Sequence, residues 1–164
     1  MKPEIVKGKD LSKKEFESSV KVKYGLKAEY SYDSGYAISK YLKGLKEGKI
    51  LGVKCHKCHR ILVPPRSFCE LCFIPIAEWI ELKDTGTVNT FSISYVSADV
   101  TRLKDPEFPA VIEIDGASPG IGIMHMLGEV KPKDIKIGMK VKALWKPEKE
   151  RIGAITDIKY FKPL

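Results

Sequence analysis

The sequence lacks an apolar run of the roughly 20 residues that a helix needs to cross a bilayer. Its first residues, MKPEIVKGKD, contain no apolar segment of the kind found in secretory signals. We therefore expect a soluble, cytoplasmic protein with no membrane partner. Because thiols stay reduced in that compartment, the cysteines are expected to be free thiols or metal ligands rather than disulfides.

The sequence also has few groups suited to catalysis. His125 is the only histidine outside the cysteine-rich region, and a lone histidine on an apolar strand is more often a satisfied core residue. Glu113 and Asp115 share one face of a predicted strand, but spacing alone does not make an acid/base pair. No glycine motif for phosphate binding is present, and residues 116–122 are interpreted as a hairpin loop. These absences favour a protein that is not an enzyme.

The positive charge of the chain is concentrated in its first 75 residues. The formal net charge is +8, of which residues 1–50 carry +5 and residues 51–75 carry +3, while residues 76–164 are balanced. Hydrophobic residues make up 43% of the chain, which is enough for a packed core. Cations for an anionic ligand are therefore expected in the first 75 residues.

Residues 1–34 are polar and are interpreted as an N-terminal extension. Ser12 and Glu15 have the spacing of a capping box, in which each side chain accepts a hydrogen bond from the other's backbone N–H. The extension is therefore either helical after Ser12 or an extended arm.

Residues 35–50 are predicted to form an amphipathic helix. Ile38, Tyr41 and Leu45 recur at helical spacing, with Ser34 suited to cap the start and Gly48 to close the end. The lysines at positions 40, 43 and 46 follow the opposite side. They form either a solvated face or a basic edge for an anionic ligand.

The C-terminal half has the pattern of short antiparallel strands. Gly, Pro and Asp separate the predicted strands. The first of them, at 76–82, either continues the cysteine-rich module or is the first strand of a barrel. A five-stranded OB-fold over 76–164 is predicted, with an SH3-like barrel as the alternative. Residues 131–138 are expected to form one helical turn or a tight loop. The strand segments are 76–82, 87–96, 109–115, 120–130, 139–145 and 151–161.

The cysteines Cys55, Cys58, Cys69 and Cys72 form two Cys-x-x-Cys pairs separated by ten residues, within a module at 51–75. A two-residue gap lets both thiolates of a pair turn toward one ion, and two pairs complete a tetrahedron. We therefore predict a structural Zn²⁺ in a zinc ribbon. Iron is the alternative ion, since the same thiolates suit it. Two matched pairs argue against dithiol redox chemistry, and four thiolates leave no open position for catalysis.

The order of these features resembles a known family. The helix ends in Gly48-Lys49-Ile50-Leu51, and Pro64-Pro65-Arg66 lies between the two cysteine pairs; Trp79 and Gly86-Thr87-Val88 follow them. This order resembles the acyl-CoA-associated proteins in which a rubredoxin-like zinc ribbon is joined to a C-terminal OB-fold. The resemblance covers about residues 35–164 and implies a mainly β fold.

The resemblance also implies a function. Family members are thought to bind acyl-CoA and, in archaea, to act with acetoacetyl-CoA thiolase and hydroxymethylglutaryl-CoA synthase as a bridging, non-catalytic subunit. Two positions depart from the family pattern, because His59 and Glu70 stand where glycine and proline are common. Both lie outside the ligand set, so they concern the geometry of the turns and not the metal.

Two ligand classes are compatible with a ribbon joined to an OB-fold. For coenzyme A or acyl-CoA, Lys54, Lys57 and Arg66 are candidate phosphate contacts, and the apolar segment 121–127 is either a covered strand or a surface for a pantetheine arm. Nucleic acid is the alternative. It is disfavoured by the neutral barrel and by an expected register that buries Phe91 and Tyr95 and leaves no aromatic stacking platform.

Overall fold

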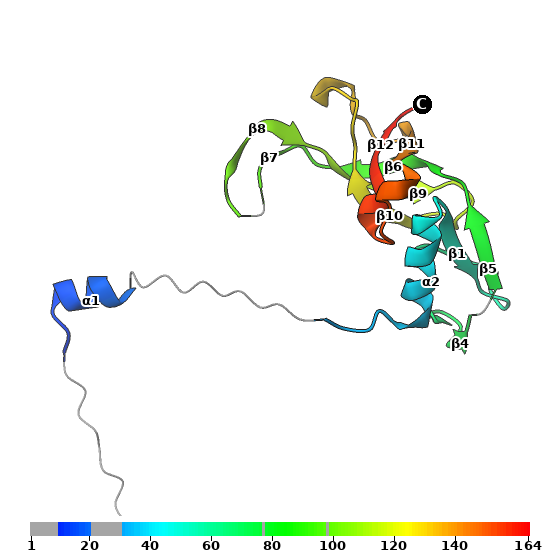
Figure 1. The fold of residues 1–164 in the computed structure, drawn as a ribbon, viewed down its shortest axis with the longest axis horizontal. Helices are drawn as coiled ribbons and strands as arrows, with labels where there is room; N and C mark the ends of the chain where they lie inside the picture. Colours follow the sequence, from blue (N-terminus) through cyan, green and yellow to red (C-terminus); the bar gives the residue numbers. More distant parts are fainter. Residues whose placement is uncertain (1–9, 21–30, 77, 98) are drawn as a thin grey trace, which may run out of the picture. The chain divides into compact units, whose positions relative to one another are not determined.

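The computed structural model describes residues 10–20, 31–76, 78–97 and 99–164, which divide into two compact units, Met1–Asp33 and Ser34–Leu164 (Figure 1). In the first unit, helix α1 spans Lys13–Val20. The backbone N–H of Ser12 donates to Glu15 Oε2 at 2.9 Å, and the Glu15 N–H donates to Ser12 Oγ at 3.3 Å. The predicted capping box and helix are confirmed; the rest of the predicted extension, at 1–9 and 21–30, lies outside the described residues.

Helix α2, Gly35–Lys46, opens the second unit close to the predicted bounds. Its end is as predicted: Gly48 has φ +78°, its N–H donates to Leu45 O at 2.9 Å, and the Lys49 N–H donates to Gly44 O at 2.9 Å. This is a Schellman motif, which needs a left-handed residue after the helix. Its start differs, since Ser34 occupies the N-cap position with helical φ and ψ and its hydroxyl makes no capping hydrogen bond.

The cysteine-rich module is built from very short strands. One sheet has the order β2-β1-β5, and a separate hairpin pairs β3 with β4. All five residues of β1 pair with β5, so the segment predicted at 76–82 joins the ribbon sheet. The strands are β1 Ile50–Lys54, β2 Ile61–Leu62, β3 Phe68–Cys69, β4 Ile74–Pro75 and β5 Glu78–Leu82.

The predicted five-stranded barrel is confirmed, with the order β10-β9-β6-β11-β12. The first and last strands meet through a bridge between Leu127 and Phe161, where the Gly128 N–H donates to Phe161 O at 2.9 Å. One 3₁₀ turn, η1 Pro132–Asp134, lies in the segment predicted as a turn or loop. The remaining elements are β6 Thr85–Phe91, β9 Pro109–Ile114, β10 Gly122–Met126, β11 Lys140–Trp145, η2 Glu148–Glu150, η3 Ile155–Asp157 and β12 Ile158–Pro163.

The single strand predicted at 87–96 is wrong at its end. β6 stops at Phe91, and β7 Ser94–Val96 pairs with β8 Arg102–Glu107 in a two-stranded sheet of its own. This hairpin, the β7–β8 arm, projects from the barrel (Figure 1). Its second strand carries four charged residues and a proline, so it has no alternating apolar pattern from which to predict it.

The predicted register of β6 is also wrong. Val88 is 1% exposed and Asn89 points outward, the reverse of the expected alternation. The ladder with β9 shifts between Val88 and Thr90, and such an irregularity changes which face later side chains occupy. Phe91, which follows the shift, is half-buried and packs against the core as predicted, whereas Tyr95 lies on the β7–β8 arm and is 56% exposed.

One apolar core connects α2, the ribbon and the barrel. It contains Tyr41 and Leu45 from α2, Ile50 from β1, and barrel residues such as Ile112 and Phe161. Burial of this continuous apolar area is the main force holding the three parts together. Neither α-helix in the described residues is long and apolar enough to cross a membrane.

Candidate functional site

Each cysteine pair lies in a tight knuckle closed by a left-handed residue. The His59 N–H donates to Cys55 O at 2.9 Å, and the Phe73 N–H donates to Cys69 O at 2.8 Å. His59 has φ +60° and Phe73 has φ +52°, a region that glycine adopts at lowest cost. The departure noted at His59 therefore leaves the knuckle geometry intact, and both knuckles use a side-chain-bearing residue at this position.

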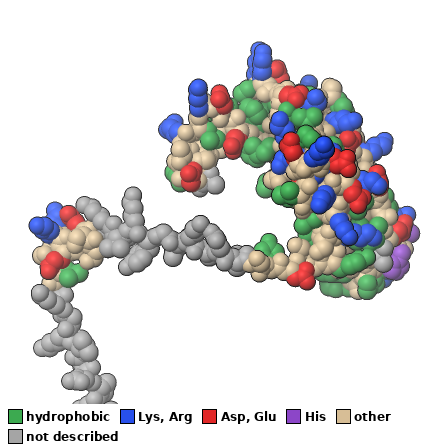
Figure 2. Space-filling view, viewed as in Figure 1, with side chains coloured by type: hydrophobic (Ala, Val, Ile, Leu, Met, Phe, Trp, Pro, Cys, Tyr) green, Lys and Arg blue, Asp and Glu red, His purple; other side chains and the backbone are tan. Residues whose placement is uncertain are grey.

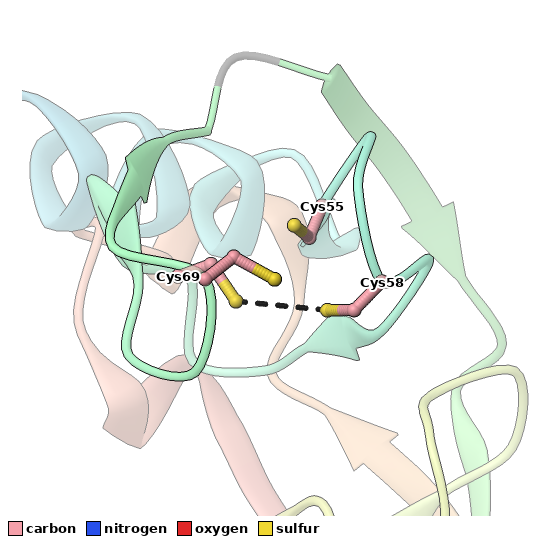
Figure 3. Close-up of side chains that lie close together, drawn as sticks. Cys55, Cys58 and Cys69 are labelled. Atoms are coloured by element: carbon pink, nitrogen blue, oxygen red, sulfur yellow. Dashed lines mark hydrogen bonds between the residues drawn. The ribbon is translucent and has the colours of Figure 1, made fainter.

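The four thiols converge on one point. All four Sγ atoms lie within 4.8 Å of one another, and Cys58 Sγ is 3.7 Å from Cys69 Sγ (Figure 3). A tetrahedron with Zn–S bonds of about 2.3 Å has edges of about 3.8 Å, so the spacing fits a four-coordinate ion. Cys55 and Cys69 are fully buried. The predicted ligand set is confirmed as a group positioned to bind a metal ion.

Without a cation, two of the thiols, Cys55 and Cys72, have opposite protonation preferences. A hydrogen bond from the Cys58 backbone N–H lowers the pKa of Cys55 to about 6. Burial, followed by the neighbouring thiols, raises the pKa of Cys72 to about 12. A divalent cation removes this conflict because its charge favours the thiolate form of every ligand.

An ion pair links the two knuckles beside the sulfurs. Arg60 Nη1 lies 2.7 Å from Glu70 Oε1, and Arg66 Nη1 lies 3.3 Å from Glu70 Oε2. Hydrogen bonds from its own backbone N–H and from Arg60, together with the charges of both arginines, lower the pKa of Glu70. Glu70 thus fixes two cations to the second knuckle, which a proline at this position could not do.

Two of the three predicted phosphate contacts already face carboxylates. Lys54 Nζ lies 3.7 Å from Glu78 Oε1, and Arg66 pairs with Glu70 as described. Lys57 is exposed and has no ion-pair partner among the described residues. On α2, Lys40 is half-buried with Nζ 4.3 Å from the centre of the Trp79 ring, so it belongs to neither a solvated face nor a free basic edge.

The methionine-rich strand β10 faces solvent on one side. Ile123 and Leu127 are buried, but Met124 is 73% exposed, so the segment is covered on one face and open on the other. It borders a groove of about 450 Å³, here called the Met124 groove. Apolar lining comes from Pro109, Met124, Met126, Ile155 and Ile158, and polar lining from His125, Lys146, Thr156 and Lys159. Sequence reasoning found the methionines and missed the lysines, which lie in segments far along the chain.

His125 is held rigidly in the wall of the Met124 groove. The Met126 N–H donates to His125 Nδ1 at 2.9 Å, so the other nitrogen, Nε2, carries the proton of the neutral ring and donates to Ile155 O at 3.2 Å. The ring also packs edge-to-face against Phe161, with centroids 5.6 Å apart. Both nitrogens are occupied, as predicted for a satisfied histidine, and neither is placed to act as a base.

Two family models match the chain. Residues 42–75 match the rubredoxin-like zinc ribbon domain of ChsH2, and residues 79–146 match the C-terminal OB-fold domain of ChsH2. A curated relative is the DUF35 domain-containing scaffold protein of Methanocaldococcus jannaschii. It is 32% identical over 118 residues, which cover 70% of this chain and 82% of the relative.

Two solved structures have similar folds. A crystal structure of a DUF35 family protein of unknown function from Sulfolobus solfataricus is 36% identical, with a TM-score of 0.56, and the match covers 67% of this chain and 78% of that one. The Ltp2-ChsH2(DUF35) aldolase is 18% identical, with a TM-score of 0.58, covering 81% of this chain and 98% of that one. At that identity the second likeness concerns the fold alone.

Proposed function

This chain belongs to the DUF35 family of proteins with a ChsH2-type zinc ribbon and OB-fold, and on that premise we propose that it is a non-catalytic subunit that binds acyl-CoA and holds partner enzymes together. The observation that carries the proposal is the closed set of four thiolates, which leaves no position on the metal for a substrate or an activated water. The ion therefore has a structural role and stabilises the fold of the ribbon.

The carboxylates of the barrel support a non-catalytic role. Thr85 Oγ1 donates to Asp115 Oδ2 at 2.7 Å and lowers the pKa of that carboxyl, while Lys140 Nζ lies 3.3 Å from Oδ1. Glu113 accepts a hydrogen bond from Asn89. A general acid needs a raised pKa and a general base needs a free lone pair facing a substrate. Asp115 meets neither requirement, because its pKa is lowered and both of its oxygens have partners.

A curated relative supports a role beside other enzymes. The relative from Methanocaldococcus jannaschii, 32% identical over 118 residues, is named a scaffold protein. For this chain we propose thiolase-like and hydroxymethylglutaryl-CoA synthase-like partners, as the family resemblance implies. The ligand passed between them would be an acyl-CoA.

Lys54, Lys57 and Arg66 are proposed as contacts to the phosphates of the coenzyme. Lys57 is the strongest of the three, because its ammonium has no ion-pair partner among the described residues. Lys54 and Arg66 must break an existing ion pair with a carboxylate before they can contact a phosphate, which reduces their net contribution to the free energy of coenzyme A binding. Charge reversal at Lys57 should therefore weaken coenzyme A binding more than reversal at Lys54.

A paired assay tests this function. The zinc-loaded chain is titrated calorimetrically with acetoacetyl-CoA and coenzyme A, and it is mixed with purified thiolase-like and synthase-like subunits for size-exclusion chromatography. We expect saturable ligand binding, co-elution with the enzymes and no turnover by the chain alone. Thioester cleavage by the chain alone, or the absence of both binding and co-elution, would contradict the proposal.

Nucleic-acid binding is a second candidate, because Tyr95 and Phe91 present aromatic surface on and beside the β7–β8 arm. Stacking on such side chains is sequence-tolerant and is accompanied by a strong salt dependence. Fluorescence anisotropy with a labelled single-stranded oligonucleotide across a salt series tests it. Tight, salt-sensitive binding without any affinity for coenzyme A would replace the first proposal.

A further inference from the structure

The Met124 groove has the composition of a ligand site. Its volume of about 450 Å³ falls within the range of small-molecule pockets. A second apolar hollow of about 240 Å³ shares Pro109 and Met124 with it and extends to Phe91, at the base of the β7–β8 arm. Figure 2 shows hydrophobic side chains on the side of the barrel beneath the arm, with Lys and Arg side chains around them. The two hollows form one apolar path on either side of Met124.

The charges beside this path are positive. Lys146 and Lys159 border the groove, and neither forms an ion pair among the described residues. Elsewhere on the barrel, Lys140, Lys142 and Lys162 each face a carboxylate within 4 Å. The nearby buried carboxylate, Asp157, is occupied by backbone N–H donors from residues 152–154. Lys159 Nζ lies 5.6 Å from the centre of the Tyr160 ring, and the charge of Lys146 contributes to the lowered pKa of Asp157. The groove therefore combines an apolar floor with two cations that form no direct ion pair among the described residues.

From this combination we infer that the Met124 groove binds the neutral, apolar acyl chain of an acyl-CoA, with Lys146 and Lys159 at its rim, where their charge favours the approach of the anionic coenzyme. This inference rests on the proposed acyl-CoA binding and assigns the acyl chain to the barrel, while the phosphates stay with the ribbon cations proposed above. His125 is a wall of the site, because both ring nitrogens already have partners. The flexible methionines allow chains of different length to be accommodated.

A chain-length series tests the inference. Calorimetric titrations of the zinc-loaded full chain would use acetyl-, butyryl-, hexanoyl- and octanoyl-CoA, with coenzyme A and octanoate as separate arms. If the groove takes the chain, affinity should rise about three- to fourfold for each buried methylene. Octanoate should bind at the same site more weakly than octanoyl-CoA, which separates a free fatty acid from a thioester as the preferred source of the chain.

Substitutions at groove residues test whether the dependence of affinity on chain length arises in the Met124 groove. Met124→Glu places a charge at a position already 73% exposed, so the fold should be retained, and it should abolish the dependence on chain length. Ile137→Glu is the matched control, because Ile137 is 69% exposed and does not line the groove. Lys146→Glu with Lys159→Glu should weaken octanoyl-CoA binding at least tenfold, whereas Lys133→Glu with Lys136→Glu, which are exposed and outside the groove, should not.

The outcomes separate this inference from the proposed function. If all acyl-CoAs bind with equal affinity, or if Met124→Glu leaves the chain-length dependence intact, the groove is not the site and acyl-CoA binding itself stands. If neither coenzyme A nor any acyl-CoA binds the unaltered chain, both fail. If Met124→Glu abolishes co-elution with a partner enzyme and leaves octanoyl-CoA binding unchanged, the groove is a protein contact and the inference is overturned.

Discussion

The ribbon and the barrel belong to one compact unit but are stabilised by different chemistry. The ribbon has a small core of Val53, Leu62 and Ile76 in which two of the metal-binding cysteines are themselves core residues. The barrel has five paired strands around a larger core that includes Ile112, Val141 and Phe161. The ribbon therefore depends on its ion, whereas the barrel depends on apolar burial.

Loss of the metal should separate the two regions most clearly. Structural zinc sites contribute on the order of 10 kcal/mol to the folding of small domains. Chelation, or Cys69→Ser, should therefore unfold β1–β5 and leave β6 and β9–β12 folded. Hydrogen exchange followed by mass spectrometry should show protection lost from 50–82 and kept in the barrel. Simultaneous loss of protection in both regions would mean that the barrel cannot fold without the ribbon.

A cavity in the core of the barrel should lower the stability of the barrel and leave metal binding by the ribbon unchanged. Phe161 is fully buried at the closure of the barrel, and Phe→Ala changes at such sites cost about 3–5 kcal/mol. Phe161→Ala should lower the barrel's free energy of unfolding by that amount and leave zinc stoichiometry at one ion per chain. Denaturant unfolding and metal analysis measure the two quantities. A variant that loses its zinc as well would show that the ribbon depends on the barrel.

Asp157 gives the barrel a pH dependence. Burial opposes its ionisation, but hydrogen bonds from the N–H groups of Ile152, Gly153 and Ala154 outweigh burial and hold the pKa of this carboxyl below its usual value. Stabilisation by the carboxylate is thus present above the ordinary Asp pKa, about 3.9, and is lost as the pH falls through the folded-state value.

Asp157→Asn should cost about 1–3 kcal/mol at neutral pH, because the amide replaces a charged acceptor and leaves N–H groups unpaired. Below pH 4 the variant and the unaltered protein should converge in stability. Thermal unfolding measured from pH 7 to pH 3 follows this difference. A constant difference across the range would show that the carboxylate is not the stabilising group.

The smallest change in stability is expected for a substitution in α2, at the place where this helix packs against the core. Tyr41 is 3% exposed, burial raises its pKa to about 12, and its hydroxyl has no hydrogen-bond partner among the residues that the structure describes. Tyr41→Phe removes an unsatisfied polar group from the core and should stabilise the chain by about 1 kcal/mol. Denaturant midpoints compare the two proteins, and a loss of stability would reveal a partner for the hydroxyl.

Features that depend on residues at a fixed spacing could be predicted from the sequence. Features formed where distant segments of the chain meet could not. Two Cys-x-x-Cys pairs predict the metal ligands, and the helical spacing around Tyr41 with Gly48 predicts α2 and its end. The β7–β8 arm has no apolar alternation. Period-two reasoning places Val88 outward although it is buried, and the shift after Val88 then interrupts the alternation before Phe91. The Met124 groove collects side chains from β9, β10, β11 and the η3–β12 segment, which no local pattern brings together.

We propose that the chain binds an acyl-CoA without transforming it, and one experiment measures both properties. The most direct measurement adds octanoyl-CoA to the zinc-loaded chain, follows binding by calorimetry and then quantifies the intact thioester by chromatography. Our account predicts one bound ligand per chain, full recovery of the thioester, and loss of the chain-length dependence in Met124→Glu but not in Ile137→Glu. Hydrolysis or transfer of the acyl group by the chain alone would contradict the claim, as would a failure to bind.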